Sequence, residues 1–303
     1  MLFFRPIQIE DIETITAFTF PGDFLNCDYA FANMCSWRFL YDSEYAIQDG
    51  YLFIRFYVEI KERKQLAYMF PVGEGDLKQA IERMAKDAET SGFSFLILGV
   101  TADNKRKLDM LFPAYFNFTP ERDYYDYIYL REDLVTLKGK KYQSKRNHIH
   151  RFNKQYDYVY LPITKEIISK CRELEQVWYE ANNVPDNKED LFHERRSMNF
   201  AMNHFNELAL LGGAIVVENK IIAFTYGSPI NNATFGIHVE KADIRYEGVF
   251  SVINQEFAKQ IPKQYVYINR EEDLGIPGLR KSKLSYHPYL LLEKNAATCL
   301  PSL

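Results

Sequence analysis

Alternating hydrophobic and polar positions in the first half of the chain predict a β-hairpin, then a helix and another strand. Residues 52–60 alternate in the way typical of a half-buried strand, and a charged turn separates them from a second strand at 65–70. Apolar residues between 77 and 88 recur at helical spacing, and Asp76 precedes them as an N-cap. The continuous apolar run 95–100 is typical of a strand covered on both faces.

The second half of the chain repeats this order of elements. Residues 214–217 and 221–226 are predicted to form a hairpin, and residues 235–239 alternate as a third strand. Apolar side chains on one face of residues 250–261 predict a helix, and residues 265–269 predict the strand after it. Little residue identity links the two halves, so the repeat is one of pattern.

A basic segment between the halves marks the predicted domain boundary. We expect an N-terminal lobe over residues 1–140, a basic inter-lobe linker helix over 141–156 and a C-terminal lobe over 157–303. Two helices, outlined by apolar residues over 167–178 and 191–205, precede the second hairpin. This order predicts an α/β protein with two lobes, each a mixed, mostly antiparallel sheet flanked by helices.

Composition is that of a globular protein and excludes a few classes of function. The 303 residues are 47% hydrophobic and 26% charged, and the net charge of −4 gives no overall attraction to DNA or to an anionic membrane. Four cysteines without C-x-x-C spacing predict reduced, buried thiols in a cytosolic protein. No run of eighteen apolar residues occurs, so no transmembrane segment is expected.

The segment 268–288, INREEDLGIPGLRKSKLSYHP, is too long for a turn between two strands. Gly275 and Gly278 flank Pro277, which favours a constrained turn, and aliphatic residues nearby are expected to need burial. Long connections inside a compact lobe are usually functional or disordered. Two interpretations stay open here, namely a functional segment and a structural ion-pair network. The network would consist of Glu271, Glu272, Asp273, Arg280 and Lys283.

The segment resembles part of an acyltransferase family whose motifs are given below, and that resemblance implies roles for three of its residues. A nucleophile attacks a carbonyl, and a cation near the carbonyl oxygen lowers the barrier. Lys283 is expected to act there or on a donor phosphate. Asp273 would orient or deprotonate an attacking amine, and Tyr286 would protonate the leaving group.

The predicted linker helix is basic, and the histidines form no metal pattern. Seven Lys or Arg lie between Lys138 and Lys154, which indicates either a footprint for phosphates or a solvated helix. His193 and Glu194 begin an H-E-x-x-H motif that Ser197 interrupts, so no metal site is expected. For His238, on the predicted third strand, packing in the core is favoured over a place at the active site.

The doubled order of elements resembles two GNAT-type acyltransferase lobes in tandem. That fold holds the pyrophosphate of coenzyme A on a Q/R-x-x-G-x-G/A loop before a helix. The stretch RYEGVF matches it at Arg245 and Gly248, with Phe250 at the last small position, so Arg245, Gly248 and Val249 are the implied cofactor-binding residues.

The stretches SKRNHIHRF and DLGIPGLRKSKLSYHP, with the doubled lobes, resemble the soluble C-terminal domain of bacterial phosphatidylglycerol lysyltransferases. That family is related to the aminoacyl-tRNA-dependent transferases that build peptidoglycan cross-bridges. The resemblance covers nearly the whole chain. Full-length lysyltransferases carry membrane spans ahead of this domain, and this chain has none. The matched positions that the resemblance implies for the site are Arg146, Arg151, Asp273, Gly275, Arg280, Lys283 and Pro288.

These observations together favour an acyltransferase with its groove in the second lobe or between the lobes. The leading hypothesis is transfer of an aminoacyl group from aminoacyl-tRNA to an amine or hydroxyl acceptor, a lipid or a small molecule, without a further cofactor. Arg146, Arg151 and Arg280 would bind substrate. The alternatives are an acetyl- or acyl-coenzyme A-dependent N-acetyltransferase and a non-catalytic binding module. The expected location is the cytoplasm, with peripheral contact at a membrane left open.

Overall fold

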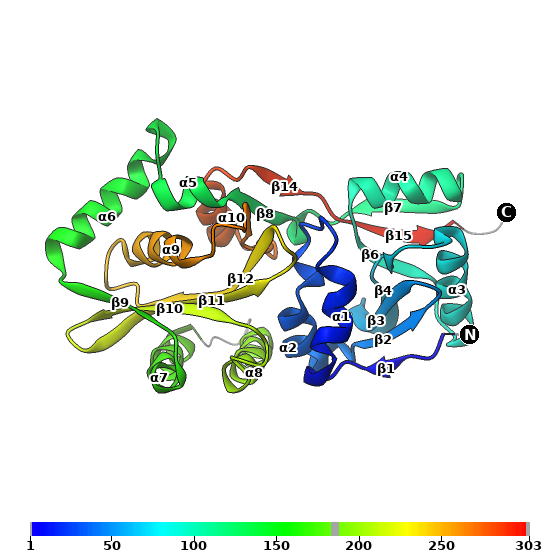
Figure 1. The fold of residues 1–303 in the computed structure, drawn as a ribbon, viewed down its shortest axis with the longest axis horizontal. Coiled ribbons are helices and arrows are strands. Elements are labelled where there is room, and N and C mark those ends of the chain that lie inside the picture. The colour runs from blue at the N-terminus through cyan, green and yellow to red at the C-terminus, as the bar shows by residue number, and fades with distance from the viewer. Residues whose placement is uncertain (1, 183–187, 301–303) are drawn as a thin grey trace.

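The strands predicted in the first half assemble into an eight-stranded sheet in the computed structural model, which describes residues 2–182 and 188–300 (Figure 1). Strand order is β1 (Arg5–Pro6), β2 (Glu44–Gln48), β3 (Tyr51–Ile60), β4 (Arg63–Tyr68), β6 (Leu96–Val100), β15 (Asn295–Cys299) and β7 (Phe116–Pro120), with β5 (Val72–Gly73) paired to β3. The helices of this lobe are α1 (Ile12–Thr19), α2 (Phe31–Tyr41), α3 (Leu77–Thr90) and α4 (Ala102–Leu111), with short 3₁₀ turns at Ile9–Asp11 and Cys27–Tyr29.

A seven-stranded sheet forms the second lobe. Its order is β14 (Leu290–Leu292), β8 (Asp126–Leu130), β13 (Tyr267–Asn269), β12 (Thr234–Ala242), β11 (Lys220–Pro229), β10 (Leu211–Val217) and β9 (Tyr158–Pro162). Its helices are α5 (Arg131–Thr136), α6 (Gln143–Gln155), α7 (Lys165–Asn182), α8 (Lys188–Asn203), α9 (Val249–Gln260) and α10 (Pro277–Leu284), and 3₁₀ turns lie at Arg122–Tyr124 and Lys140–Tyr142. Helices α6 and α9 lie on one side of this sheet and α7 and α8 on the other (Figure 1).

Both predicted hairpins and the repeated order of elements are confirmed. The β3–β4 turn places Lys61 and Glu62 at positive φ, and the β10–β11 turn does the same with Glu218 and Asn219. Two consecutive residues with φ > 0 form the tight turn whose twist matches that of a hairpin. Asp76 caps α3 as expected, because its carboxylate accepts a hydrogen bond from the amide of Gln79.

Each lobe completes its sheet with a strand from the other half of the chain. Strand β8 lies in the predicted first lobe by number but pairs with β13 and β14 of the second sheet. Strand β15 comes from the C-terminus but pairs between β6 and β7 of the first sheet. The division of sheets therefore differs from the predicted boundary at residue 140, because the chain crosses between the lobes near 120–126 and returns near 292–295.

The predicted linker is a helix, but it does not join the lobes. Helix α6 covers Gln143–Gln155 and packs on α9 within the second lobe, since β8 and α5 before it already belong there. Phe152 is its fully buried residue and packs with the apolar residues beneath α9. The prediction that this helix connects the two lobes is therefore wrong.

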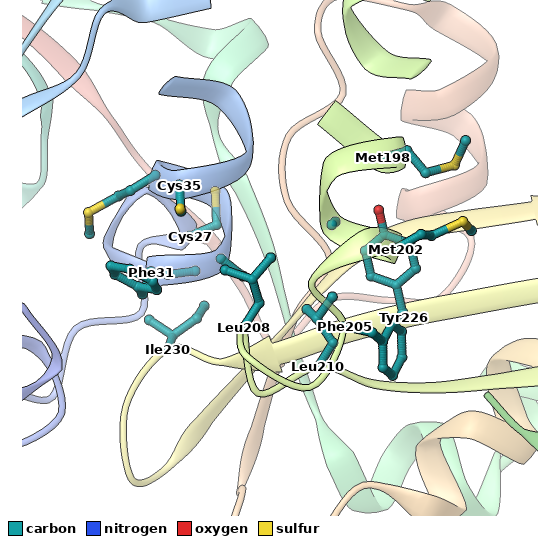
Figure 2. Packing of buried hydrophobic residues seen from close by; sticks show 14 of the residues in the cluster. Cys27, Phe31, Cys35, Met198, Met202, Phe205, Leu208, Leu210, Tyr226 and Ile230 are labelled. Atoms are coloured by element: carbon teal, nitrogen blue, oxygen red, sulfur yellow. The ribbon is translucent and has the colours of Figure 1, made fainter. Parts of the chain in front are cut away.

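One apolar core runs through both lobes. It combines residues of α2 and its preceding turn with residues of α8, β11 and the loop after α8. In Figure 2, Cys27, Phe31 and Cys35 from the first lobe face Leu208 and Ile230 from the second. A separate core fills the space between α3 and the first sheet. Because buried apolar area is the main stabilising term in folding, this shared core fixes the lobes against each other.

The segment 268–288 contains α10 rather than an extended loop. Pro277 stands at the first turn of this helix, where its missing N–H costs no hydrogen bond. Leu274, Ile276 and Leu284 are exposed, so the expectation that these aliphatic side chains need burial was wrong. The segment is ordered instead by polar contacts, which are described next.

Candidate active site

Strands β12 and β13 run parallel over a short stretch and then diverge. They pair only through Thr234–Gly236 and Tyr267–Asn269. Beyond this point β12 continues to Ala242, whereas the amide of Arg270 donates instead to the carbonyl of Tyr127 in β8, 2.9 Å away. Polar side chains of β12 and of the chain that follows β13 can therefore point toward one another beyond this stretch.

A β-bulge on β12 displaces His238 from the regular alternation of the strand. Ile237 lies opposite Gly227 and Val239 lies opposite Tyr226, so His238 is the extra residue between two ladder pairs. Bulges reorient single side chains and are common beside active sites. Here the imidazole is directed toward Ser228 on the neighbouring strand and toward the chain that follows β13.

The His238 ring is held at both nitrogens. Its Nδ1 lies 2.8 Å from the Glu271 carboxylate and its Nε2 lies 2.7 Å from the Ser228 hydroxyl. The same Glu271 oxygen accepts a hydrogen bond of 2.7 Å from the amide of Asn33 in α2. The side chain of His238 is 6% exposed. This His238–Glu271–Ser228 array therefore joins two strands of the second lobe to a helix of the first.

The partners of His238 define what the array can do chemically. A carboxylate only accepts hydrogen bonds, so Nδ1 carries the proton that faces Glu271. Nε2 is then the basic nitrogen, which accepts a proton from Ser228 or from a substrate group in its place. An imidazole oriented by a carboxylate in this way is suited to general base catalysis.

A second buried cluster lies where the chain crosses between the lobes. The Cys27 thiol is 3.3 Å from Asp126 and 3.5 Å from Glu272, and the Lys294 ammonium is 2.8 Å from Asp126 and 3.1 Å from Asp28. Asp126 also accepts from the amide of Cys27 at 2.8 Å. Residues from both lobes thus share one ion-pair network.

The charges of this cluster are set by its burial. Burial raises the pKa of Cys27 well above its ordinary value, so the thiol stays protonated and is a weak nucleophile. Burial also raises the pKa of Glu272 to about 7, against the attraction of Lys294. Burial opposes the charge on Lys294, but Asp126 and Asp28 outweigh it and raise its pKa. Three of these residues (Cys27, Asp126 and Glu272) have metal-ligating atoms close together, but the Lys294 ammonium already supplies the compensating positive charge.

Asp273 is buried, and of the ion-pair network that was the alternative prediction it forms the pair with Arg280. Its carboxylate accepts from Arg280 at 2.7 and 2.9 Å, from Arg122 at 2.9 Å, from Tyr127 at 2.6 Å and from the amide of Gly275 at 2.9 Å. Burial raises its pKa, but the hydrogen bonds from Arg280 and Tyr127 outweigh burial and hold the pKa well below its usual range. A carboxylate that is stabilised in this way is a weak base. Arg280 is paired with Asp273 and is therefore not free to bind substrate.

Lys283 and Tyr286 are also buried, and each makes structural contacts. The Lys283 ammonium donates to the carbonyl of Arg270 at 2.5 Å and to that of Glu272. These two carbonyls flank Glu271, so Lys283 holds the backbone that presents this carboxylate. Tyr286 is 3% exposed, and its hydroxyl lies 3.5 Å from Ser251 in α9. Burial lowers the pKa of Lys283 and raises that of Tyr286.

In the predicted coenzyme A loop, the carbonyl of His148 in α6 lies against Gly248. Gly248 has φ +90° and caps α9, and a Cβ on it would lie 2.8 Å from the carbonyl oxygen of His148 in α6. Val249 is buried, and Arg245 pairs with Asp243 in solvent. A carbonyl oxygen against the amino end of α9 would repel a phosphate from the amides that such a ligand needs.

The two linker arginines lie on the outside of the second lobe. Arg146 donates to the carbonyls of Leu137 and Gly139, the latter at 2.7 Å, and Arg151 lies 3.5 Å from Glu247. Both residues are exposed. They are not brought next to His238, but they remain on one basic surface with the other cations of α6 and its preceding turn.

The structure assembles site residues that the sequence did not bring together. His238 was considered but assigned to the core, Glu271 was named only in the ion-pair network, and Ser228 was not considered. The β-bulge that displaces His238 leaves no pattern in the residues themselves. Asp273 was named from the sequence as a base, and in the structure its carboxylate accepts from the amide of Gly275 and holds the turn before α10.

Comparisons with known proteins agree with the predicted fold. The family model described as "Phosphatidylglycerol lysyltransferase, C-terminal" matches residues 22–297. A conserved protein of unknown function from Bacteroides thetaiotaomicron is 51% identical, with a TM-score of 0.94 over 99% of this chain and 100% of that one. An uncharacterized protein of Mycoplasmoides gallisepticum is 24% identical over 170 residues, which are 56% of this chain. The match spans about half (54%) of the length of that protein.

More distant structures share the arrangement of the lobes. L-PGS from Bacillus licheniformis is 15% identical, with a TM-score of 0.63 over 96% of this chain and 92% of that one. FemX is 9% identical, with a TM-score of 0.60 over 97% of each chain. The predicted fold class, two tandem GNAT-like lobes of mixed sheet flanked by helices, is confirmed.

Proposed function

The chain belongs to the family of phosphatidylglycerol lysyltransferase C-terminal domains, and from that premise we propose that it transfers an aminoacyl group from an aminoacyl-tRNA to an amine or hydroxyl acceptor. Membership of an aminoacyltransferase family supports the class of reaction. The donor and the acceptor are the parts that we propose here.

The observation that supports transfer most directly is the His238–Glu271–Ser228 array. In the proposed step the acceptor amine or hydroxyl displaces Ser228 from Nε2 and gives its proton to His238 as it attacks the ester carbonyl. A bond forms between the acceptor atom and the carbonyl carbon. The bond from that carbon to the ribose oxygen of the tRNA then breaks, and the proton passes from His238 to this oxygen.

Glu271 and Lys283 act through His238 rather than on the substrate. Glu271 holds the ring in one tautomer and stabilises the imidazolium that forms during attack. Lys283 binds the carbonyls on both sides of Glu271 and thereby places it. We therefore propose that Lys283 is a positioning residue, in place of the direct role on a carbonyl oxygen expected from the sequence.

Two further observations bear on the donor. Exposed cations of α6 and of the turn before it offer a surface for RNA phosphates, because no Asp or Glu lies between residues 134 and 156. The coenzyme A alternative has less support, because the carbonyl of His148 faces the predicted pyrophosphate site. A non-catalytic module would bind the same donor without transfer.

Phosphatidylglycerol is the first acceptor to test, because the family model carries its name. No helix within residues 2–182 and 188–300 has the length and apolarity needed to cross a bilayer.

A transfer assay tests the proposal. The purified chain would be incubated with labelled lysyl-tRNA, or with total aminoacyl-tRNA, and with phosphatidylglycerol vesicles or a panel of soluble amines. Transfer of label to any of these acceptors is expected. Acetyl transfer from acetyl-coenzyme A, together with no transfer from aminoacyl-tRNA, would contradict the proposal and favour the second hypothesis.

A further inference from the structure

A pair of cations lies on the α9 side of the second sheet, away from the side where His238 meets the first lobe. Arg270 follows β13, and Lys145 projects from α6. Both stack on the ring of Tyr286, with the Lys145 ammonium 3.9 Å and the Arg270 guanidinium carbon 5.0 Å from the ring centroid. The guanidinium is also 5.8 Å from the ring of Tyr129. Two positive charges thus contact the same aromatic ring, that of Tyr286.

The pair is incompletely compensated. Arg270 binds Glu240 of β12 at 3.0 Å, and its side chain is 9% exposed. Its second terminal nitrogen, Nη1, is buried and has no hydrogen-bond partner within the part of the chain that the structure describes. Buried guanidinium donors are rarely left unpaired, because removing them from water costs free energy that only a partner returns.

Asn254 in α9 borders the same place. It is buried, its amide lies 3.5 Å from Glu240, and its side-chain oxygen has no partner among the described residues. The charged groups that act on Lys145 are Arg270 and, in the opposite sense, Glu240. One carboxylate therefore faces two cations, and the unpaired nitrogen of one of them, Arg270, lacks an acceptor. The missing component is an acceptor with negative charge.

We propose that Lys145 and Arg270, beside Asn254, form a binding site for the oxyanion of one phosphate group. The anion would accept from the free nitrogen of Arg270 and from the Lys145 ammonium, which is partly exposed and lifts from the Tyr286 ring to admit it. Arg presents a fixed fork to phosphate and Lys a mobile point charge, so the two serve complementary roles.

The phosphate has two sources under the proposed function, the acceptor end of the tRNA donor and the head group of a lipid acceptor. Assignment to either one rests on that function, whereas the anion site itself does not. The site and the transfer reaction can therefore fail separately.

Titration with inorganic phosphate, followed by calorimetry on the intact chain, tests the site. Saturable binding at pH 7 is expected, with a loss of about tenfold or more in affinity for Lys145→Met and recovery in Lys145→Arg. Lys154→Met, a substitution at an exposed lysine of the same helix, serves as the matched control and should bind as the unmodified chain does. Equal affinity in the Lys145→Met variant, or no saturable binding by a folded chain, would overturn the site.

The pH dependence gives a readout that a merely structural lysine would not move. Burial, and then the charge of Arg270, lower the pKa of Lys145 to about 8. The ammonium is therefore present at pH 7 and mostly lost at pH 9, so affinity should fall about tenfold over this range and fall much less in Lys145→Arg. Equal pH dependence of the two proteins would count against Lys145 as a ligand.

Competition identifies the source of the phosphate. Displacement of inorganic phosphate by the trinucleotide CCA assigns the site to the donor, and displacement by phosphatidylglycerol vesicles assigns it to the acceptor. Displacement by neither, with binding still dependent on Lys145, supports the anion site but overturns its connection to the transfer reaction.

Discussion

Glu271 and Glu272 are adjacent in the chain but have different surroundings. Glu271 meets His238 and Asn33, both of which donate hydrogen bonds to it. Glu272 is turned toward Cys27 and the acidic residues Asp126 and Asp28, and its pKa is raised to about 7. One carboxylate thus accepts hydrogen bonds from both lobes, while burial raises the pKa of its neighbour.

The raised pKa of Glu272 makes stability depend on pH. The unfolded chain ionises this carboxyl near its ordinary value of 4.5, whereas the folded chain does so near 7, so stability is lost as pH rises between these values. Glu272→Gln should therefore increase the free energy of unfolding by about 1–2 kcal/mol at pH 8 and by much less at pH 4.5. Urea denaturation at the two pH values would measure this, and an equal gain at both would show that ionisation is not the cause.

At the scale of elements, ion pairs and hydrogen bonds hold α10 and the turn before it in place. Leu274 and Gly275 both have positive φ, and Asp273 holds this turn through the amide of Gly275 while it binds Arg280 in α10. Few apolar contacts add to these, because Leu274, Ile276 and Leu284 are exposed. The order of the segment therefore depends on one buried carboxylate.

Asp273→Asn should lower the free energy of unfolding by about 3 kcal/mol, because it leaves Arg280 and Arg122 without their buried partner. Asp123→Asn is the matched control, since Asp123 binds the same Arg280 at 2.7 Å but is exposed, and it should cost less than about 1 kcal/mol. Chemical denaturation would measure both proteins. Similar losses in the two variants would mean that the burial of Asp273 is not what stabilises α10.

Elements whose sequence signals lie close together in the chain could be predicted. Hairpins, α3 and α9 were predicted because period, caps and turn residues lie within a few positions of one another. His238 was expected in the core, because the bulge that exposes its ring to Ser228 and Glu271 depends on the register between β11 and β12. The partners of Asp273 were foreseen only in part: Arg280 is close in sequence, whereas Arg122 and Tyr127 arrive through strand β8.

At the scale of the whole molecule, the exchange of β8 and β15 ties the lobes into one unit. Their mutual placement depends on pairing between residues far apart in sequence, which hydrophobic patterns within each half do not report. This is why the fold class could be predicted while the path of the chain between the sheets could not. Cys27, Asp126 and Lys294 gather where the chain crosses, and Lys294 directly precedes β15.

Because the lobes exchange strands, neither of the two lobes predicted from the sequence should fold when it is produced alone. A fragment of residues 1–140 lacks β15, which lies between β6 and β7, and should show a poorly dispersed amide NMR spectrum. The matched test joins residues 1–125 through a flexible linker to 293–300, which restores β15, and this chain should be better folded. A well-dispersed spectrum for residues 1–140 would refute the interlocked arrangement.

The central claim is that His238 takes the proton of the acceptor, and the rate of aminoacyl transfer in a single turnover tests it most directly. His238→Gln, compared with His204→Gln on the surface of the second lobe as control, should slow transfer by about 100-fold or more while donor affinity stays nearly unchanged. A His238→Gln protein that is folded and transfers the aminoacyl group at the rate of the control would contradict the account.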